Sequence, residues 1–594
     1  MTADTTALRA DLATLGARTD AFLGRSFLHR LDGLAGESFT MAPADEVNRS
    51  FAEFGLGLVA DPRRLAEAQA KLWRDSFALW RNVLQARPRG RLEPLFTTPP
   101  NDRRFKDKAW QDEPGWTYLQ QSYFLMSNWL HRLVDDADLD PDTRRRVKFY
   151  TRQYLSAMAP SNFPLTNPEA LRRARETEGR SLVDGLARFL DDLERGDGRL
   201  RVRRTDEAAF TLGDNIAATP GKVVFRNDLM ELIQYAPATA TVHRRPLLLV
   251  PPWINKYYIL DLQKDNSFVK YIVDQGFTVF LISWINPPAE LADRRFEDYL
   301  RAGPLAALAA VEAATGEREV NVLGFCIGGI LTAALLSHLA AEGDRRVTSA
   351  TFLATLFDFT DVGDIGVFVD ERQVAAVERH TAATGFLAGR HMADMFSMLK
   401  ENDLLWSFFV DNYLLGKAPE PFDLLYWNGD ATRLPAAMLS DYLRGFYLNN
   451  ALARPGTLDL LAHPLDTRRV TVPTYALATR DDHIAPWTSC WPVTAQFAGP
   501  VRFVLGGSGH IAGVINPPAR AKYGYWTRDD AGADAADWLA GASRHAGSWW
   551  PDWAAWLAEH GGESVPARDP AAGGLTPLDD APGRYVRMRA DSSD

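Results

Sequence analysis

Residues 320–330, VNVLGFCIGGI, restrict the fold more than any other stretch of the chain. The branched apolar run before Cys326 predicts a buried strand, and the apolar run after it predicts a buried helix. Between them, Gly324, Cys326 and Gly328 match the pattern Gly-x-nucleophile-x-Gly, with cysteine as the nucleophile. Glycines on both sides are expected because side chains there would clash at so sharp a corner. The stretch therefore predicts a strand–turn–helix unit of an α/β sheet.

Short apolar runs of the same kind recur on both sides of this unit. Strands are expected in six segments, residues 245–252, 277–284, 319–325, 347–356, 470–479 and 501–507. A hairpin is expected over residues 222–235, with Asn227 and Asp228 at its turn. Strands that alternate with helices predict a mostly parallel, doubly wound sheet.

The alternation of strands and helices is confined to part of the chain. Residues 1–200 show helical spacing and are predicted to form a separate helical domain, followed by a sheet domain over residues 201–575. An aromatic, helix-like stretch of about 358–469 interrupts the sheet domain. It is too long for a loop and is expected to cap the carboxyl edge of the sheet. Residues 576–594 are expected to form a tail.

Aromatic residues are concentrated in the helical region before residue 200. Two stretches carry most of them, residues 63–85 and 116–136. An aromatic stripe of this kind is usually part of a core, but it also suits an apolar docking surface. Both interpretations stay open from the sequence.

The partners of Cys326 are expected after the last two strands, in the order acid and then histidine. Asp482 and His510 follow those strands, with His510 as the base and Asp482 orienting its ring. Asp481 is the rival acid and His483 is the rival base. The chain's other cysteine, Cys490, is expected to be a buried helix residue.

Oxyanion stabilisation requires two backbone N–H donors near the nucleophile. The amide of Ile327, at the start of the helix, is one candidate. The loop at residues 251–256 should supply the other. Its first two residues are prolines and have no N–H, so Ile254 is favoured over Trp253.

Composition and the lack of long apolar runs argue against several classes of function. A net charge of −10 argues against binding to nucleic acid, and two cysteines in 594 residues fit a reducing compartment. The N-terminus lacks the apolar core of a signal peptide, and no apolar run is long enough to predict a membrane span. No metal site and no bound cofactor are predicted.

Several separated motifs resemble polyhydroxyalkanoate synthases of the first class. The matching stretches are PPWINKYYILDL, GFCIGG, DDHIAPW, GHIAGVINPP, GSWWPDWAAWL and, nearer the N-terminus, KDKAWQDEPGWTYLQQSY. The resemblance implies a capped α/β-hydrolase fold with Cys326, Asp482 and His510 as catalytic residues, and a homodimer. It also implies growth of polyester on cytoplasmic granules from short-chain (R)-3-hydroxyacyl-CoA, with release of CoA.

Apart from the resemblance, a cysteine nucleophile suits acyl transfer from CoA thioesters. Thiolate attack on a CoA thioester yields another thioester, so the acyl group stays activated for transfer. Lys256, at the end of the loop at 251–256, and Lys400, in the expected cap, are candidates to bind the CoA phosphates. Two alternatives remain open: a cysteine-dependent hydrolase such as an intracellular polyester depolymerase, and a non-catalytic granule-surface protein.

Overall fold

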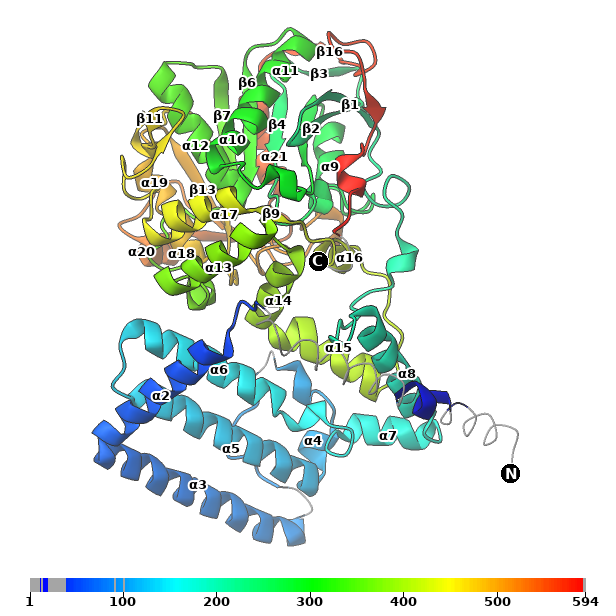
Figure 1. Ribbon diagram of the computed structural model, residues 1–594, viewed down its shortest axis with the longest axis vertical. Helices are drawn as coiled ribbons and strands as arrows, with labels where there is room; N and C mark the ends of the chain where they lie inside the picture. The colour runs from blue at the N-terminus through cyan, green and yellow to red at the C-terminus, as the bar shows by residue number, and fades with distance from the viewer. Residues whose placement is uncertain (1–10, 12–13, 20–38, 90–91, 100–101, 591–594) are drawn as a thin grey trace. The chain divides into compact units, whose positions relative to one another are not determined.

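The computed structural model describes residues 11, 14–19, 39–89, 92–99 and 102–590. They divide into two compact units, shown in Figure 1. The helical unit comprises Met1–Asp206 and Asp394–Glu420, and the sheet unit comprises Glu207–Ala393 and Pro421–Asp594. The first boundary thus falls at residue 206, where the sequence predicted about 200, and part of the expected cap belongs to the helical unit.

Between residues 39 and 206, the described part of the helical unit contains seven α-helices. They are α2 (Ala44–Ala60), α3 (Pro62–Arg89), α4 (Ala109–Asp112), α5 (Pro114–Asp136), α6 (Pro141–Ala157), α7 (Pro168–Glu176) and α8 (Arg180–Arg195). Asp140 caps α6 by accepting N–H bonds from Asp142 and Thr143. Asn167 caps α7 in the same way, through the N–H of Ala170.

The segment Asp394–Glu420 packs on α8 in this unit. It forms η8 (Asn402–Trp406), α15 (Ser407–Phe409) and η9 (Val410–Leu414). A Cβ added at Gly185 of α8 would lie 2.0 Å from the carbonyl oxygen of Tyr413, so the two backbones meet there. The Tyr413 hydroxyl also donates to Asp192 at 2.6 Å. These contacts explain why a segment predicted as cap belongs with the helical unit.

The aromatic residues of the helical unit fall into two groups. Phe105, Trp110 and Phe124 are buried against one another and form a small core. Trp73 and Phe77 of α3, in contrast, are 69% and 62% exposed. The core interpretation therefore holds for Phe105, Trp110 and Phe124, whereas the aromatic side chains of α3 are exposed and the docking interpretation for them stays a prediction.

The sheet unit is built on one mixed sheet of eleven strands. Their order is β15-β14-β13-β12-β7-β6-β4-β5-β2-β1-β17. The six central strands run parallel: β13 (Val501–Gly506), β12 (Thr474–Thr479), β7 (Val347–Leu353), β6 (Val320–Phe325), β4 (Leu247–Val250) and β5 (Val279–Trp284). Each of the six lies within a segment predicted as a strand, so the α/β fold class is confirmed.

Antiparallel strands complete both edges of the sheet. One edge holds β2 (Met230–Tyr235), β1 (Gly221–Arg226) and β17 (Asp579–Asp580), and the other holds β14 (Tyr525–Thr527) and β15 (Ser543–His545). β1 and β2 are the predicted hairpin, and Asn227 donates its N–H to the Met230 carbonyl at the turn. β17 and the buried Val586 show that most of the expected tail is part of this unit.

Helices pack on the sheet and bury its central strands (Figure 1). α12 (Ile327–Glu342) follows β6 and is apolar on most of its surface, which fits its burial within the unit. On α21 (Trp550–Glu559), Trp550 and Trp553 contact Phe268 of α9 (Phe268–Asp274) with ring centroids 4.9 and 5.0 Å apart. This packing fixes the strands whose ends carry the candidate site.

The insertion between β7 and β12 is mainly helical. Within the sheet unit it includes α13 (Glu371–Thr384), the start of α14 (Gly389–Leu399), α16 (Asp423–Asn428), α17 (Ala436–Tyr442) and η10 (Leu443–Leu448). It also contains four strands of two residues each. β8 (Phe386–Leu387) pairs with β9 (Leu434–Pro435), and β10 (Asp459–Leu460) pairs with β11 (His463–Pro464). Among the described helices, none combines the length and apolarity needed to cross a membrane.

Candidate active site

Cys326 lies at the corner between β6 and α12. Its backbone has φ 54° and ψ −121°, in the positive-φ region that side chains other than glycine rarely occupy. Holding a residue there costs on the order of 1–3 kcal/mol, which the packed strand and helix must offset. The N–H of Cys326 donates to the Leu353 carbonyl at 2.9 Å and ties the corner to β7. The thiol is half-buried.

The flanking glycines are required by close backbone contacts. A Cβ on Gly324 would lie 2.6 Å from the Cα of Gly329, and one on Gly328 would lie 2.2 Å from the Val250 carbonyl oxygen. Both distances are too short for any side chain. The predicted reason for glycine at these two positions is therefore confirmed, and the corner also packs directly against the end of β4.

His510 and Asp482 form a buried pair on the loops after β13 and β12. Nδ1 of His510 lies 2.7 Å from Oδ2 of Asp482. The other carboxylate oxygen accepts the N–H groups of Ile484 and Ala485, both at 2.8 Å, and the Thr479 hydroxyl donates to Oδ2 at 3.0 Å. Four groups thus hold the Asp482 carboxylate, two of them from its own loop, and its side chain is 0% exposed.

The electrostatics of this pair favour a charged imidazolium. Burial alone would lower the pKa of His510, but the Asp482 carboxylate, the Cys326 sulfur and hydrogen bonds to both raise it to about 10. Burial likewise opposes ionisation of Asp482, and the His510 charge, with the backbone N–H bonds, holds its pKa below the usual value. The imidazole therefore connects the carboxylate to the thiol.

The structure distinguishes the predicted acid and base from their rivals. The hydrogen bond of His510 goes to Asp482, whereas Asp481 is exposed. Asp481 and His483 are thus not the residues joined in this pair. Cys490 ends the short helix α18 (Trp487–Cys490) and is buried, as predicted, with its sulfur 3.6 Å from the Ala485 carbonyl.

The candidate oxyanion donors come from the first residue of α12 and from the loop after β4. Ile327 is the first residue of α12, where a backbone N–H has no acceptor within the helix. Ile254 is half-buried in the loop after β4, and its carbonyl accepts the N–H of Thr432 at 3.0 Å. The neighbouring Trp253 ring packs 4.8 Å from the ring of Tyr299. Both donors remain predictions.

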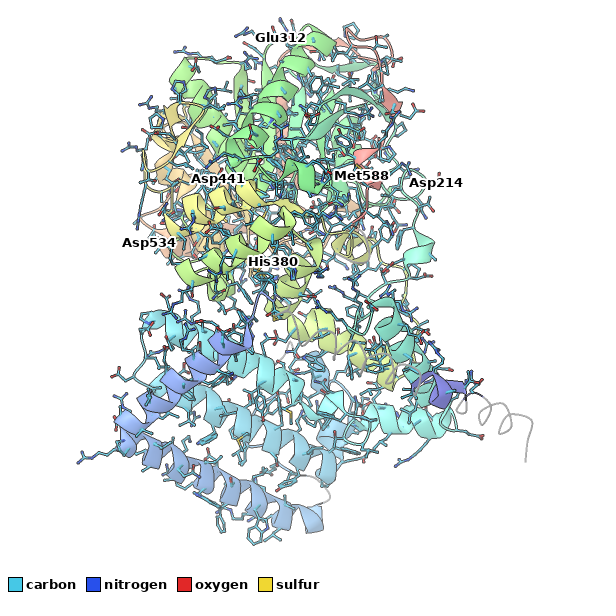
Figure 2. All side chains as sticks on the ribbon, viewed as in Figure 1. Asp214, Glu312, His380, Asp441, Asp534 and Met588 are labelled. Atoms are coloured by element: carbon cyan, nitrogen blue, oxygen red, sulfur yellow. The ribbon has the colours of Figure 1, made fainter. Side chains whose placement is uncertain are left out.

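Lys256 has a different environment from the one the sequence suggested. Its ammonium is buried and donates to the backbone carbonyls of Tyr585 and Met588, the latter labelled in Figure 2. Burial lowers its pKa to about 8, against the opposing effect of Asp430. A CoA phosphate could reach this ammonium only if the bonds to the C-terminal segment broke, so this geometry does not favour phosphate binding.

Lys400 lies in the helical unit, because Asp394–Glu420 belongs there. It follows the last turn of α14 and is half-exposed. Its neighbour Glu401 is buried and accepts the Ser156 hydroxyl at 2.8 Å. Lys400 and the other predicted site residues thus belong to different units, and its role in CoA binding stays a prediction.

Two tyrosines of the insertion face the site and were not singled out from the sequence. Tyr442 ends α17, and Tyr447 lies five residues later in η10, a π-helix. Burial raises the pKa of both hydroxyls, and the nearby sulfur of Cys326 raises them further. Five-residue spacing places side chains on one face only in a π-helix, so helical periodicity could not reveal the pair.

Comparison with known proteins places this site in a family. A family model described as poly-beta-hydroxybutyrate polymerase (PhaC) N-terminus matches residues 101–272, and one described as alpha/beta hydrolase fold matches residues 246–517. A poly(3-hydroxyalkanoate) polymerase of Methylorubrum extorquens is 50% identical over 92% of this chain and 90% of its own. The chain belongs to the poly(3-hydroxyalkanoate) polymerase family.

Two further members of this polymerase family match as broadly. The PhaC subunit of Rhizobium meliloti (strain 1021) is 46% identical over 92% of this chain and 90% of its own. The PhaC subunit of Cupriavidus necator is 45% identical over 90% of both chains. The resemblance inferred from the sequence motifs and the α/β-hydrolase fold are therefore confirmed.

Proposed function

We propose that this polymerase family member is a first-class synthase, converting short-chain (R)-3-hydroxyacyl-CoA into polyester through an acyl group carried on Cys326. The observation that carries the proposal is a thiol at the strained corner, beside a buried imidazole that is itself paired with Asp482. A nucleophile, a base and an orienting carboxylate in one linked set suit acyl transfer.

The first half-reaction loads the enzyme. His510 accepts the thiol proton, and the Cys326 sulfur attacks the thioester carbonyl. The amides of Ile327 and Ile254 are the donors proposed to stabilise the oxyanion. When the intermediate collapses, the carbon–sulfur bond to CoA breaks, and the imidazolium returns its proton to the departing thiolate.

The second half-reaction extends the chain. His510 removes the proton from the 3-hydroxyl of an incoming acyl group, whose oxygen attacks the Cys326 thioester. An ester bond forms, and the released sulfur recovers the proton. Cys326 lies close enough to Tyr442 and Tyr447 to raise the pKa of both hydroxyls, and the two rings help to exclude the water that would release free acid.

A pair of substrates separates this proposal from a hydrolase. With (R)-3-hydroxybutyryl-CoA we expect continuous CoA release and insoluble polymer. Butyryl-CoA has no 3-hydroxyl, so it should release about one CoA per active site and then stop, because the acyl group has no acceptor. CoA release can be followed with a thiol reagent, and products by extraction and mass analysis.

Two results would contradict the synthase proposal. Continuous formation of butyrate from butyryl-CoA would show that water is the normal acceptor, as in a depolymerase. Absence of CoA release from both substrates in folded protein would favour a non-catalytic granule-surface protein.

We further propose that α3 docks on the polyester surface of granules. Four apolar residues at helical spacing form an exposed stripe, Trp73, Phe77, Trp80 and Leu84, with exposed fractions of 69%, 62%, 52% and 48%. Apolar groups stabilise contact with a hydrophobic surface by about 25 cal/mol per Å2 that they bury. A stripe of this kind marks an interaction surface.

Point substitutions test this docking better than deletion of the first 200 residues. Such a deletion would remove Gly185 and Asp192, which hold the retained segment Asp394–Glu420. We expect the triple variant W73S/F77S/W80S to keep CoA release from small substrate and to sediment at least about tenfold less with purified granules. Leu165→Ser, at a position in the same unit that is 78% exposed, is the control.

Equal granule recovery of the triple variant and the control would refute α3 docking. If the triple variant binds granules normally but its molar mass by light scattering is half that of the parent, the stripe belongs instead to the interface of the expected homodimer.

A further inference from the structure

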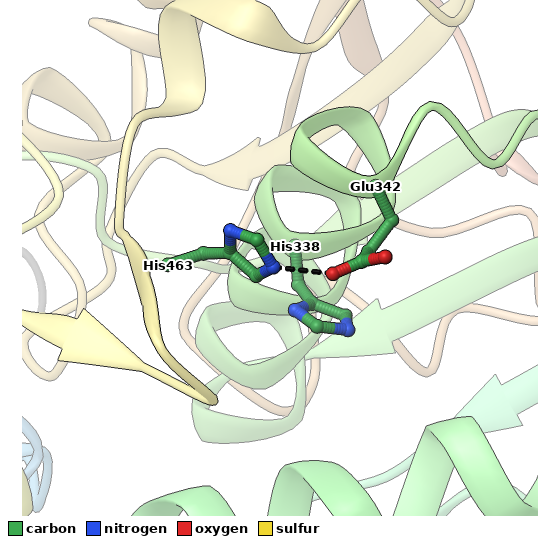
Figure 3. Close-up of side chains that lie close together, drawn as sticks. All are labelled: His338, Glu342 and His463. Carbon is green, nitrogen blue, oxygen red and sulfur yellow. Dashed lines mark hydrogen bonds and ion pairs between the residues drawn. The ribbon is translucent and has the colours of Figure 1, made fainter.

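A cluster of two histidines and one glutamate lies at the far end of α12 from Cys326. His338 and Glu342 are four residues apart, so they share one face of the helix. His463 comes from β11 of the β10–β11 hairpin, which lies near the end of the insertion. Figure 3 shows the three side chains converging between the helix and the hairpin.

The geometry of the cluster suits a metal ion. One ligand atom from each residue lies within 4.8 Å of the others. Nε2 of His463 contacts Oε1 of Glu342, and the two imidazole rings have centroids 5.3 Å apart. Tetrahedral zinc with nitrogen ligands at about 2.0–2.1 Å needs ligand separations of about 3.3 Å. The His463 and Glu342 side chains are 31% and 53% exposed, so they have room to close that difference.

A simple ion pair between His463 and Glu342 leaves His338 unexplained. Its Nδ1 is buried, and the described residues offer it no hydrogen-bond partner. A buried imidazole nitrogen without a partner costs free energy unless the ring serves another purpose.

We propose that His338, Glu342 and His463 bind one divalent transition-metal ion of the zinc type. Two imidazoles and a carboxylate are ligands that Zn²⁺ favours, and water would complete the coordination. His338 lies twelve residues after Cys326, or about 18 Å along the helix, so the ion takes no part in the chemistry. It would instead fasten the hairpin at the end of the insertion to the helix that carries the nucleophile.

This site departs from the expectation that the chain binds no metal. His338 and Glu342 alone look like an ordinary polar helix face. Their third partner, His463, is 121 residues beyond Glu342, and only the folded hairpin brings it near.

Zinc uptake by the full chain tests the proposal. Cys326→Ala protein, stripped with chelator, is used throughout so that zinc cannot bind the catalytic thiol. After dialysis against Zn²⁺ with excess Mg²⁺, we expect one zinc per chain by elemental analysis, and a rise in Tm on zinc addition. His338→Gln or His463→Gln in the same background should weaken zinc binding at least about 100-fold and remove the rise in Tm.

His131→Gln is the matched control, because it removes a half-buried histidine that is not part of the cluster. It should bind zinc as the parent does. Equal zinc uptake by the His463→Gln and parent proteins, or no uptake by the parent at micromolar zinc, would overturn the proposal. The two cluster variants should keep their Tm in the absence of metal, which separates lost binding from misfolding.

Discussion

Replacing Cys326 with alanine should abolish CoA release and polymer formation while the protein still folds. Loss of the nucleophile of a catalytic triad typically costs about 10^6-fold in kcat. A φ of 54° is as strained for alanine as it is for cysteine. The substitution therefore does not change the backbone strain at the corner, and the fold should persist. CoA release is measured with a thiol reagent, and folding by circular dichroism.

Cys326→Ser gives a graded control for the same site. A hydroxyl is far less acidic than a thiol, so His510 would have to remove a more tightly held proton. We expect a small residual rate with serine and none with alanine. CoA release by the alanine variant at a rate near that of the parent would show that another residue carries the acyl group.

Removing His510 and removing Asp482 should affect the two half-reactions differently. His510→Gln should lower acylation of Cys326 by about 10^2–10^4-fold, since the base is lost. Asp482→Ala should leave acylation within about tenfold, because a thiol ionises readily, but should lower elongation by at least about 100-fold, because an alcohol does not. Labelling by radioactive butyryl-CoA reports acylation, and polymer mass from (R)-3-hydroxybutyryl-CoA reports elongation.

Alanine is a better substitute than asparagine in this experiment. Oδ1 of Asp482 accepts two backbone N–H groups, so an asparagine there would keep its oxygen on them and turn its NH2 toward His510. That would force the ring tautomer with a hydrogen on Nε2, which cannot accept a proton from the thiol. Equal loss of labelling in Asp482→Ala and His510→Gln would contradict the division of labour.

Local pattern was sufficient to predict the sheet and its sharp corner. The six central strands are short apolar runs bounded by turns, and Gly324 and Gly328 mark the corner within five residues, although the contact that requires Gly328 is with Val250 of β4. The candidate triad followed because parallel strands bring their carboxyl ends to one edge. Local pattern alone could not separate Asp481 from Asp482; the fold buries one and exposes the other.

The features that the sequence did not reveal depend on contacts between distant segments. Lys256 is buried because residues more than 300 positions later reach back to its ammonium. Asp394–Glu420 belongs to the helical unit and not to the cap, because Gly185 has no side chain and the backbone of Tyr413 can therefore pack closely on α8. The tyrosines near Cys326 depend on a π-helix, whose period the usual helical pattern does not describe.

The bonds from Lys256 to the carbonyls of Tyr585 and Met588 set an order for assembly during translation. A ribosome that has added His510 must still add 78 residues before Met588 is made, which takes about 4–16 s at 5–20 residues per second. Throughout that interval the nascent chain contains all three candidate catalytic side chains, but the loop after β4 lacks its anchor. The loop that carries the candidate donor Ile254 can therefore gain this anchor only after the segment that contains Tyr585 and Met588 has been synthesised.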